Sequence, residues 1–388
     1  MMHITSEYTH FHNKTRLDKV KEATAAVCVQ NRSRWTEAIK EIRTWPEYEP
    51  QPLHTLPHQA EQLCIRELFF KDESKRFGVS LGSFKALGAP CAVFKILADH
   101  VFSKTGVRPT SEELRTGKYN DITHKVTVCG CRCVDYIHSH VSPGRAEMIK
   151  DLGAVVIRID GEYEASVERA KEDARMNGWH FVSSTSWGDF DNGIPQNVMN
   201  AYMVVVEEAL QAILPWRISH MFLFAVTLSN QGRVLTPLRL IVVEPREADC
   251  LFQSAQKEEI CLSEGSLGTL MAGLTCRGPS PAAWKILTWL ASDFVAVPDE
   301  VAIEGMKELG SGRRGDVPVV CGKSSAANMG VILQYANDET LREILGLNRN
   351  SQVILFGLEG DTDTAIYEKL VGKTLEEVFA AQERGFKL

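Results

Sequence analysis

Apolar runs of strand length alternate along the chain with stretches whose apolar residues recur every three or four positions. The runs of strand length lie at residues 68–71, 155–159, 221–226, 240–243, 317–320 and 353–356. The helical spacing predicts helices at residues 85–100, 165–177 and 198–213, and a further helix that ends near Asp151 with Gly153 as its C-cap. Strands that alternate with helices favour a mainly parallel sheet, so we expect an α/β fold.

Two connections along the chain are shorter than a parallel sheet requires. Residues 124–129 and 132–138 each have the pattern of a strand, and only Gly130 and Cys131 lie between them. Parallel neighbours need a crossover of a dozen or more residues, usually a helix, so either the two runs form one long strand or one of them leaves the sheet. After the run at 221–226, the next strand begins about a dozen residues later. We therefore expect two crossover helices to be absent.

The composition of the chain limits which class of protein it can be and indicates its cellular compartment. The chain has 388 residues, more than one simple core usually holds, so we expect two domains. It is 44% hydrophobic and 24% charged, and its net charge of -7 argues against nucleic acid as a partner. No apolar run approaches the roughly 20 residues that span a bilayer, and residues 1–7 lack the pattern of a secretory signal. Ten cysteines without such a signal indicate reduced thiols, so we expect a cytoplasmic protein that binds no membrane.

Cys129, Cys131 and Cys133 alternate along an apolar run, which places all three on one face of a strand. A structural metal site would need a Cys-x-x-Cys turn and a second pair of ligands elsewhere. The chain has neither, so we interpret these cysteines as residues of a strand face and expect no metal.

Lys85 is the residue whose setting most strongly suggests chemistry. It follows the apolar run at 68–71, comes shortly after Gly82 and Ser83, and opens the helical stretch at 85–100. At the start of a helix, desolvation and the positive end of the helix dipole favour an uncharged amine. Only an uncharged amine attacks an aldehyde to form a Schiff base. An exposed lysine at a helix start is the alternative that this residue alone leaves open.

The stretch around Lys85 resembles the lysine motif of the fold-type-II pyridoxal-phosphate enzymes, the tryptophan synthase β-like superfamily. Within that superfamily it is most similar to the diaminopropionate ammonia-lyase family. Further similar motifs follow in the order of that family, at residues 241–250, 269–274, 279–284 and 359–363. The resemblance extends from about Leu68 to about Tyr367.

This resemblance implies a two-domain α/β fold with mainly parallel sheets. Residues 1–88 and 190–388 would form a large, discontinuous domain that binds pyridoxal 5'-phosphate, and residues 89–189 a smaller α/β domain. Lys85 would hold the cofactor as a Schiff base, with Ser83 as a further cofactor-binding candidate. The implied activity is the elimination of an amine from 2,3-diaminopropionate or a similar small amino acid, which gives pyruvate and ammonia. The family is commonly dimeric, so we expect a homodimer.

The chain departs from the family pattern at its two short connections. Near Gly130 the family carries an Asp-Gly-Asn-His-Gly loop and a helix, which have no counterpart in this sequence. After residue 226 the family has a glycine-rich loop that binds the cofactor phosphate. Thr227, Ser229 and Arg233 stand there instead and could offer donors to a phosphate. A surface connection is the alternative for these three residues.

Single positions depart from the family as well. Ser184 stands where the family has an acid/base aspartate, and Asp189 or Asp191 could replace it. Leu358 stands in place of a hydroxyl that would face the pyridine nitrogen, and Lys323 in place of a glutamate. The alternative to an active lyase is a degraded homologue that keeps the fold without the reaction, or a shortened product of altered splicing or gene structure.

Four further acidic residues are candidates. Asp72 and Glu73 precede Lys85, and we expect them to brace its segment, with a solvated surface as the alternative. Glu244 and Asp249 follow a buried strand at its C-terminal end, where the active sites of α/β proteins gather, so they could face the site.

Overall fold

The structure is a computed structural model that describes residues 2–4, 9–13, 32–124, 126–127, 134–139, 141, 143–151, 153–161, 163–183, 193–213, 218, 220–223, 238–312, 315–361 and 363–385. The chain divides into two compact units. Unit 1 combines Met1–Gln30, Glu47–Ala86 and Tyr202–Leu388, and unit 2 combines Asn31–Pro46 and Leu87–Ala201. The segment Asn31–Pro46, expected in the large domain, groups with unit 2.

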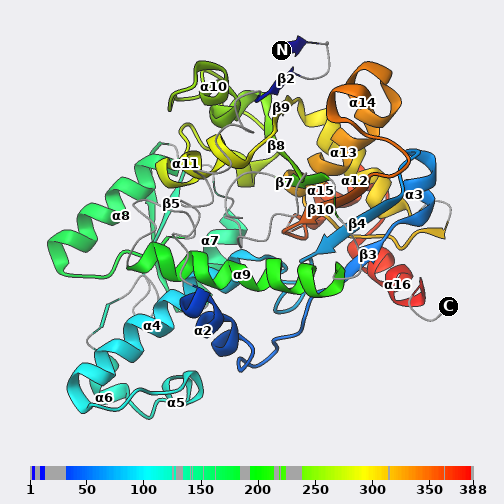
Figure 1. The fold of residues 1–388 in the computed structure, drawn as a ribbon. Coiled ribbons are helices and arrows are strands. Elements are labelled where there is room, and N and C mark those ends of the chain that lie inside the picture. Colours follow the sequence, from blue (N-terminus) through cyan, green and yellow to red (C-terminus); the bar gives the residue numbers. More distant parts are fainter. Residues whose placement is uncertain are drawn as a thin grey trace. The chain divides into compact units, whose positions relative to one another are not determined.

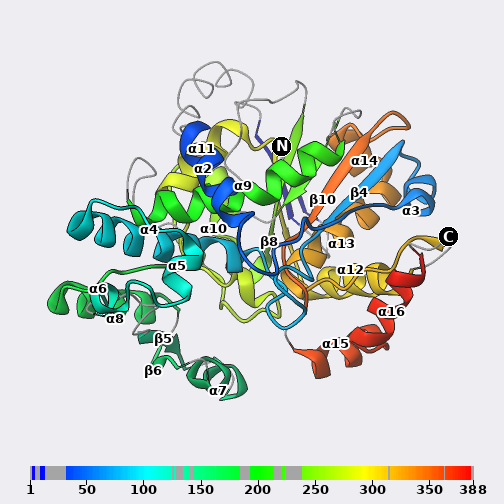
Figure 2. The same cartoon turned by 90° about the horizontal axis from the view of Figure 1, so that it is seen from below.

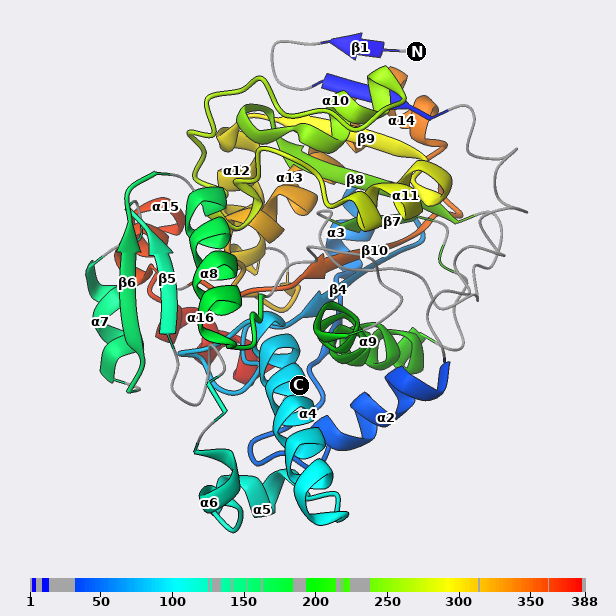
Figure 3. The same cartoon turned by 90° about the vertical axis from the view of Figure 1, so that its left-hand side faces the viewer.

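Unit 1 is built on an eight-stranded sheet with the order β1-β2-β9-β8-β7-β10-β4-β3 (Figures 1 and 3). Its central strands run parallel to one another and are β4 (Glu67–Asp72), β10 (Gln352–Gly357), β7 (His220–Leu223), β8 (Arg239–Pro245) and β9 (Asp293–Val297). Antiparallel strands close both edges, namely β3 (Leu53–Thr55) beside β4, β2 (Thr9–His12) beside β9, and β1 (Met2–Ile4) beside β2. The α/β class with a mostly parallel sheet is therefore confirmed.

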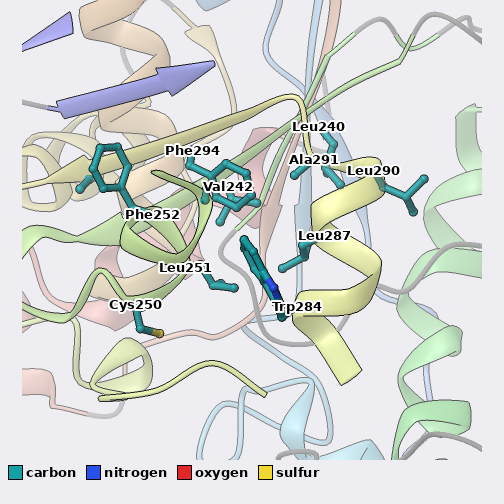
Figure 4. Packing of buried hydrophobic residues seen from close by; sticks show 12 residues of the cluster. Leu240, Val242, Cys250, Leu251, Phe252, Trp284, Leu287, Leu290, Ala291 and Phe294 are labelled. Atoms are coloured by element: carbon teal, nitrogen blue, oxygen red, sulfur yellow. The ribbon is translucent and has the colours of Figure 1, made fainter. Parts of the chain in front are cut away.

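Helices cover both faces of this sheet because its central strands are apolar on both sides. Leu240 and Val242 of β8 and Phe294 of β9 pack in one cluster with α10 (Cys250–Lys257) and α11 (Pro281–Leu290), as Figure 4 shows. Successive side chains of a strand point to opposite faces, so Ile241 and Val243, both fully buried, point to the other face. On that side α13 (Lys323–Asn337) contacts β7, β8 and β10.

Helices α12 (Asp299–Ser311) and α13 pack so closely that their backbones come into contact. A Cβ atom on Gly330 would lie 2.0 Å from the carbonyl oxygen of Val301, and one on Gly305 would lie 2.0 Å from the carbonyl oxygen of Ala326. Only glycine permits such an approach, so these two residues set the spacing of the helix pair.

The remaining elements of unit 1 are α3 (Pro57–Gln62), η1 (Arg246–Ala248), η2 (Ala272–Leu274), α14 (Glu339–Leu345), α15 (Thr364–Val371) and α16 (Leu375–Gly385). Unit 2 contains a parallel pair of strands, β5 (Val134–His138) and β6 (Val155–Ile159). Its helices are α2 (Arg32–Ile42), α5 (Ser111–Arg115), α6 (Asn120–Thr123), α7 (Pro143–Asp151) and α8 (Tyr163–Asn177). Two longer helices, α4 (Lys85–Thr105) and α9 (Ile194–Ile213), begin in one unit and end in the other.

Helix α4 is, among the described helices, the one long and apolar enough to cross a membrane by length and composition. This is weak evidence, because the core helix of a globular unit passes the same test. Leu97 of α4 packs in an apolar cluster with Val126, which is the behaviour of a core helix.

Most predicted elements are confirmed, among them the strands at 68–71, 155–159, 240–243 and 353–356 and the helices that start at or near 85, 165 and 198. The strand predicted at 317–320 is wrong: these residues have no regular structure, although Val319 and Val320 are buried and the amide of Val319 binds the carbonyl of Leu309. Burial between α12 and α13, not strand pairing, explains this apolar run.

The two short connections lie largely outside the described residues. His124 does not start a strand, because it is the C-cap of α6 and its amide donates a hydrogen bond to the carbonyl of Asn120. Cys129, Cys131 and Cys133 lie outside the described residues. Strands β7 and β8 are parallel neighbours, and residues 224–238 connect them. That connection reaches the length of a crossover, but residues 224–237, including any helix there, are not described.

Candidate active site

The candidate site lies at the carboxyl ends of β4 and β10, which are neighbours in the sheet (Figures 1 and 2). Parallel α/β sheets place their ligands at this edge, because the loops that leave the strands converge there. The loop after β4 leads to Lys85, and the loop after β10 carries Glu359 and Asp361.

The segment before Lys85 is held by close backbone contacts. Gly82 has φ +36, and a Cβ atom on it would lie 2.6 Å from the carbonyl oxygen of Ser74, so the turn requires glycine. The Gly82 carbonyl accepts a hydrogen bond from the amide of Gly360, at 2.7 Å, and the amide of Phe84 donates to the carbonyl of Leu358, at 3.0 Å. The loop after β4 is thereby tied to the loop after β10.

The structure brings the predicted residues Ser83 and Lys85 together. The Ser83 hydroxyl accepts a hydrogen bond from the backbone amide of Lys85, at 3.3 Å, and α4 starts at Lys85. Lys85 is half-buried, and no described residue pairs with its side-chain amine. An amine in this position is free to react with a ligand.

A buried cluster of charges supports the loop that leads to Lys85. The guanidinium of Arg76 donates to the Glu73 carboxylate at 2.8 Å and 3.1 Å, and to Glu208 of α9 at 2.7 Å. The Lys71 ammonium lies 2.8 Å from Glu73 and 2.8 Å from Glu208. Burial alone would raise the pKa of Glu208, but the charges of Lys71 and Arg76 outweigh it and lower that pKa.

Asp72 is the second buried acid of this segment. Its carboxylate binds His54 at 3.1 Å, the amide of Ser74 at 2.9 Å and the side-chain amide of Gln382 at 3.1 Å. Burial would raise the pKa of Asp72, but the hydrogen bonds from His54 and Ser74 and the charge of His54 lower it overall. Asp72 and Glu73 thus brace the segment before Lys85 in this structure and do not lie on a solvated surface.

The loop after β10 contains two carboxylates with different surroundings. Asp361 is buried and lies 3.4 Å from the ammonium of Lys323, and it accepts the amide of Asp363 at 2.7 Å. Burial raises the pKa of Asp361 despite these partners. Glu359 is half-buried, and no described residue donates a hydrogen bond to its carboxylate.

Glu244 and Asp249 have partners that explain them without a ligand. Glu244 accepts the amides of Leu251 at 3.1 Å and Phe252 at 2.7 Å, and therefore caps the first turn of α10. Asp249 accepts hydrogen bonds from the hydroxyl of Ser263 at 2.9 Å and the amide side chain of Gln253 at 2.6 Å. Both carboxylates therefore organise the end of β8.

The other sequence-predicted site residues, Asp189, Thr227 and Ser229, lie outside the described residues, as do Ser184, Asp191 and Arg233. Sequence reasoning did not single out Glu208, or Glu359 as a candidate site residue. The signal for Glu208 was an acidic residue at helical spacing from Val204 and Val205 on an otherwise apolar face of α9. Among the described residues, no group of three His, Cys, Asp or Glu side chains is suited to a metal ion.

A family model described as pyridoxal-phosphate dependent enzyme matches residues 126–345 of this chain. The chain belongs to the pyridoxal-phosphate dependent enzymes. Among curated proteins it is similar to the diaminopropionate ammonia-lyase of Salmonella typhimurium, with 31% identity over 386 residues that cover 89% of this chain and 94% of that protein.

Solved structures agree with this assignment. The fold is similar to that of the holo diaminopropionate ammonia lyase of Escherichia coli, with a TM-score of 0.80 and 27% identity, over 95% of this chain and 98% of that one. The same enzyme in complex with D-serine also gives a TM-score of 0.80 and 27% identity, over 97% and 98% of the two chains. The two-domain fold expected of a fold-type-II enzyme is therefore confirmed as a fold class.

Pyridoxal phosphate is the cofactor of this family, and the described residues fit it at two points. The amine of Lys85 has no partner among them and stands at the carboxyl edge of the sheet, where an aldehyde can reach it. Beside it, two glycines let the segments around Glu359 pack closely: a Cβ atom on Gly273 would lie 2.9 Å from the Ser324 hydroxyl, and one on Gly322 would lie 2.5 Å from the Gly360 carbonyl. Side chains at these positions would fill the edge of the site.

Proposed function

We propose that this enzyme is an ammonia-lyase that converts 2,3-diaminopropionate and water into pyruvate and two molecules of ammonia. The observation that carries the proposal is the position of Lys85, which begins a helix at the carboxyl edge of the parallel sheet and whose amine pairs with no described residue. The substrate follows the names of the relatives, to which this chain is similar over most of its length. D-serine, bound in one of those structures, is a second small amino acid worth assaying.

Lys85 has two tasks in this proposal. Its amine would hold the cofactor through the aldehyde, and as a free amine it would take the proton from the substrate Cα atom. When bound, pyridoxal phosphate supplies the electron sink for the charge left at Cα. Ser83 orients the lysine by accepting its backbone amide.

Three residues outside the described part complete the proposed site. Asp189 is the proposed second acid/base group, because it lies close in sequence to the position where the family has an aspartate. Thr227 and Ser229 are proposed to donate hydrogen bonds to the cofactor phosphate, since in the sequence they follow shortly after β7, a parallel neighbour of β10. Hydroxyls and amides at such an edge suit a phosphate dianion.

The stoichiometry of the products tests this function. With 2,3-diaminopropionate, the purified protein supplied with pyridoxal phosphate should release two molecules of ammonia per pyruvate, whereas serine can give only one. A Lys85→Ala variant should release neither product, and borohydride should fix the cofactor to the unaltered protein but not to the variant. A folded, cofactor-free protein that makes no pyruvate from either amino acid would instead identify a homologue that has lost the reaction.

We also propose an oligomeric state and a cellular compartment for this enzyme. We expect a homodimer, which light scattering of the purified protein would detect, and a cytoplasmic location. No disulfide joins the described cysteines Cys64, Cys91, Cys250, Cys261 and Cys321, which suits a reducing compartment. A small amino acid is the expected partner at the site.

A further inference from the structure

Ser83 and Glu359 face each other across a short antiparallel bridge. The flanking hydrogen bonds run from Phe84 to Leu358 and from Gly360 to Gly82, so Ser83 and Glu359 themselves form a non-hydrogen-bonded pair. In such a pair the two side chains leave the same face and their Cβ atoms lie about 4.5–5.5 Å apart. The Glu359 side chain therefore starts beside Ser83, two residues from Lys85.

The Glu359 carboxylate lies over two glycines. Its Oε1 atom would be 3.4 Å from a Cβ atom on Gly273 and 3.3 Å from one on Gly322, the residue that precedes α13. Glycine at these two positions lets the carboxylate pack close to the backbone of both segments. No described residue donates a hydrogen bond to it, and Glu359 is half-buried, so its acceptor atoms are available to a ligand.

Asp361, the other carboxylate of this loop, is less suited to bind a ligand. It is almost fully buried, and the Lys323 ammonium and the Asp363 amide already contact it. The pairing of Lys323 with Asp361 also offsets the positive charge of Lys323 near the site. The negative charge of Glu359 therefore remains without a described counter-charge next to the lysine that begins α4.

We propose that Glu359 determines substrate specificity by binding the ammonium group on Cβ of a 2,3-diamino acid. This inference rests on the proposed function. Serine carries a hydroxyl where diaminopropionate carries the second nitrogen, and a carboxylate distinguishes them because charge-assisted hydrogen bonds are roughly twice as strong as neutral ones.

The same contact favours departure of the amine. A nitrogen held as ammonium leaves as neutral ammonia when the Cβ–N bond breaks, because it takes both electrons of that bond and needs no further proton. The α-proton is lost to a base in the same elimination, so charge balances. The hydroxyl of serine would leave as hydroxide unless an acid protonated it, and a carboxylate at Glu359 cannot supply that proton.

A Glu359→Gln variant tests this inference, because glutamine keeps the size of the side chain and removes its charge. We expect kcat/KM for 2,3-diaminopropionate to fall about ten- to a hundredfold, as loss of a hydrogen bond to a charged group predicts, and kcat/KM for serine to change less than about threefold. Glu359→Asp should recover part of the loss. The control is Glu147→Gln on α7, whose side chain is 65% exposed and which should leave both values unchanged.

A binding measurement separates this inference from the proposed function. In the Lys85→Ala background, where turnover is blocked, diaminopropionate should raise the melting temperature more than serine does, and Glu359→Gln should abolish that difference. If the unaltered enzyme fails to make pyruvate from diaminopropionate but this binding preference depends on Glu359, the proposed function fails and the inference stands. Equal losses for both amino acids, no loss for either, or no preferential binding of diaminopropionate would overturn the inference.

Discussion

The guanidinium of Arg76 lies 2.7 Å from the carboxylate of Glu208, although 132 residues separate them along the chain and both side chains are buried. With Lys71 and Glu73 they form a group of two cations and two anions, so the cluster carries no net charge. Because Arg76 belongs to the loop that ends at Lys85, this group joins α9 to the segment that carries the proposed cofactor-binding lysine.

Replacement of Glu208 by glutamine tests how much that cluster stabilises unit 1. The change leaves one of two buried cations uncompensated, and we expect the free energy of unfolding to fall by about 3–5 kcal/mol. Urea unfolding followed by fluorescence measures the loss. The control is Glu168→Gln on α8, whose side chain is 72% exposed beside Lys171, and which should change stability by less than about 1 kcal/mol. Equal effects of the two variants would contradict a structural role for the cluster.

Replacement of Gly330 by alanine tests the close approach of α12 and α13. The new Cβ atom would lie 2.0 Å from the Val301 carbonyl oxygen, so the helices must separate, and we expect a loss of at least about 1–3 kcal/mol. Gly385→Ala is the matched control, because its nearest neighbour would be the Val317 Cγ2 atom at 3.6 Å. Thermal unfolding of both variants gives the comparison, and a Gly330→Ala protein as stable as Gly385→Ala would show that the helices are not packed this way.

Glu244 gives stability a pH dependence near neutrality. Burial raises the pKa of Glu244 from its ordinary value of 4.5 to about 8 in the folded protein, despite the hydrogen bonds that it accepts. Between these values the folded state keeps a proton that the unfolded state has lost. The free energy of unfolding should therefore fall as pH rises from about 4.5 to about 8, by up to about 1.4 kcal/mol per pH unit, and the loss should be complete above that range.

The Glu244→Gln variant isolates this effect, since glutamine does not titrate. Urea unfolding of both proteins at about pH 5.5 and about pH 7.5 should give a difference in stability that shifts in favour of the variant at the higher pH. Other titrating groups act equally on the two proteins and cancel in that difference. A difference that stays constant with pH would mean that Glu244 is ionised throughout.

The sequence pattern correctly predicted the elements whose apolar residues recur at regular spacing and pack against a sheet or a helix. Residues 68–71 and 353–356 are examples, and they form β4 and β10. The run at 317–320 has the same composition, but it is buried as an irregular segment between two helices. Strand β9 was missed, because its buried first residue, Asp293, interrupts the apolar pattern. Its burial is explained only in the folded chain, where Arg239 at 2.8 Å, His12 at 2.8 Å and His10 at 3.1 Å contact its carboxylate.

The site was predictable to the extent that its chemistry is local. The short segment from Gly82 to Lys85 carries its own signal, a glycine turn and a lysine at a helix start, and the structure places both as expected. The surroundings of Glu359 depend on Gly273 and Gly322, which approach it only in the folded chain. A single sequence therefore indicates a candidate lysine more readily than the surroundings of the residue that we propose to select the substrate.

Strand β10 lies between β7 and β4 in the sheet, yet it is the last strand in the chain. During synthesis, β4 leaves the ribosome with only β3 to pair with, and its partner β10 follows 285 residues later, as the pairing of Val353 with Leu68 shows (353 − 68 = 285). Unit 2 is complete in sequence at Ala201, long before that partner exists. The nascent chain therefore lacks the partner of one edge of β4 through most of translation, and a stop codon between residues 298 and 351 would leave β3 and β4 without the strand that joins them to β7.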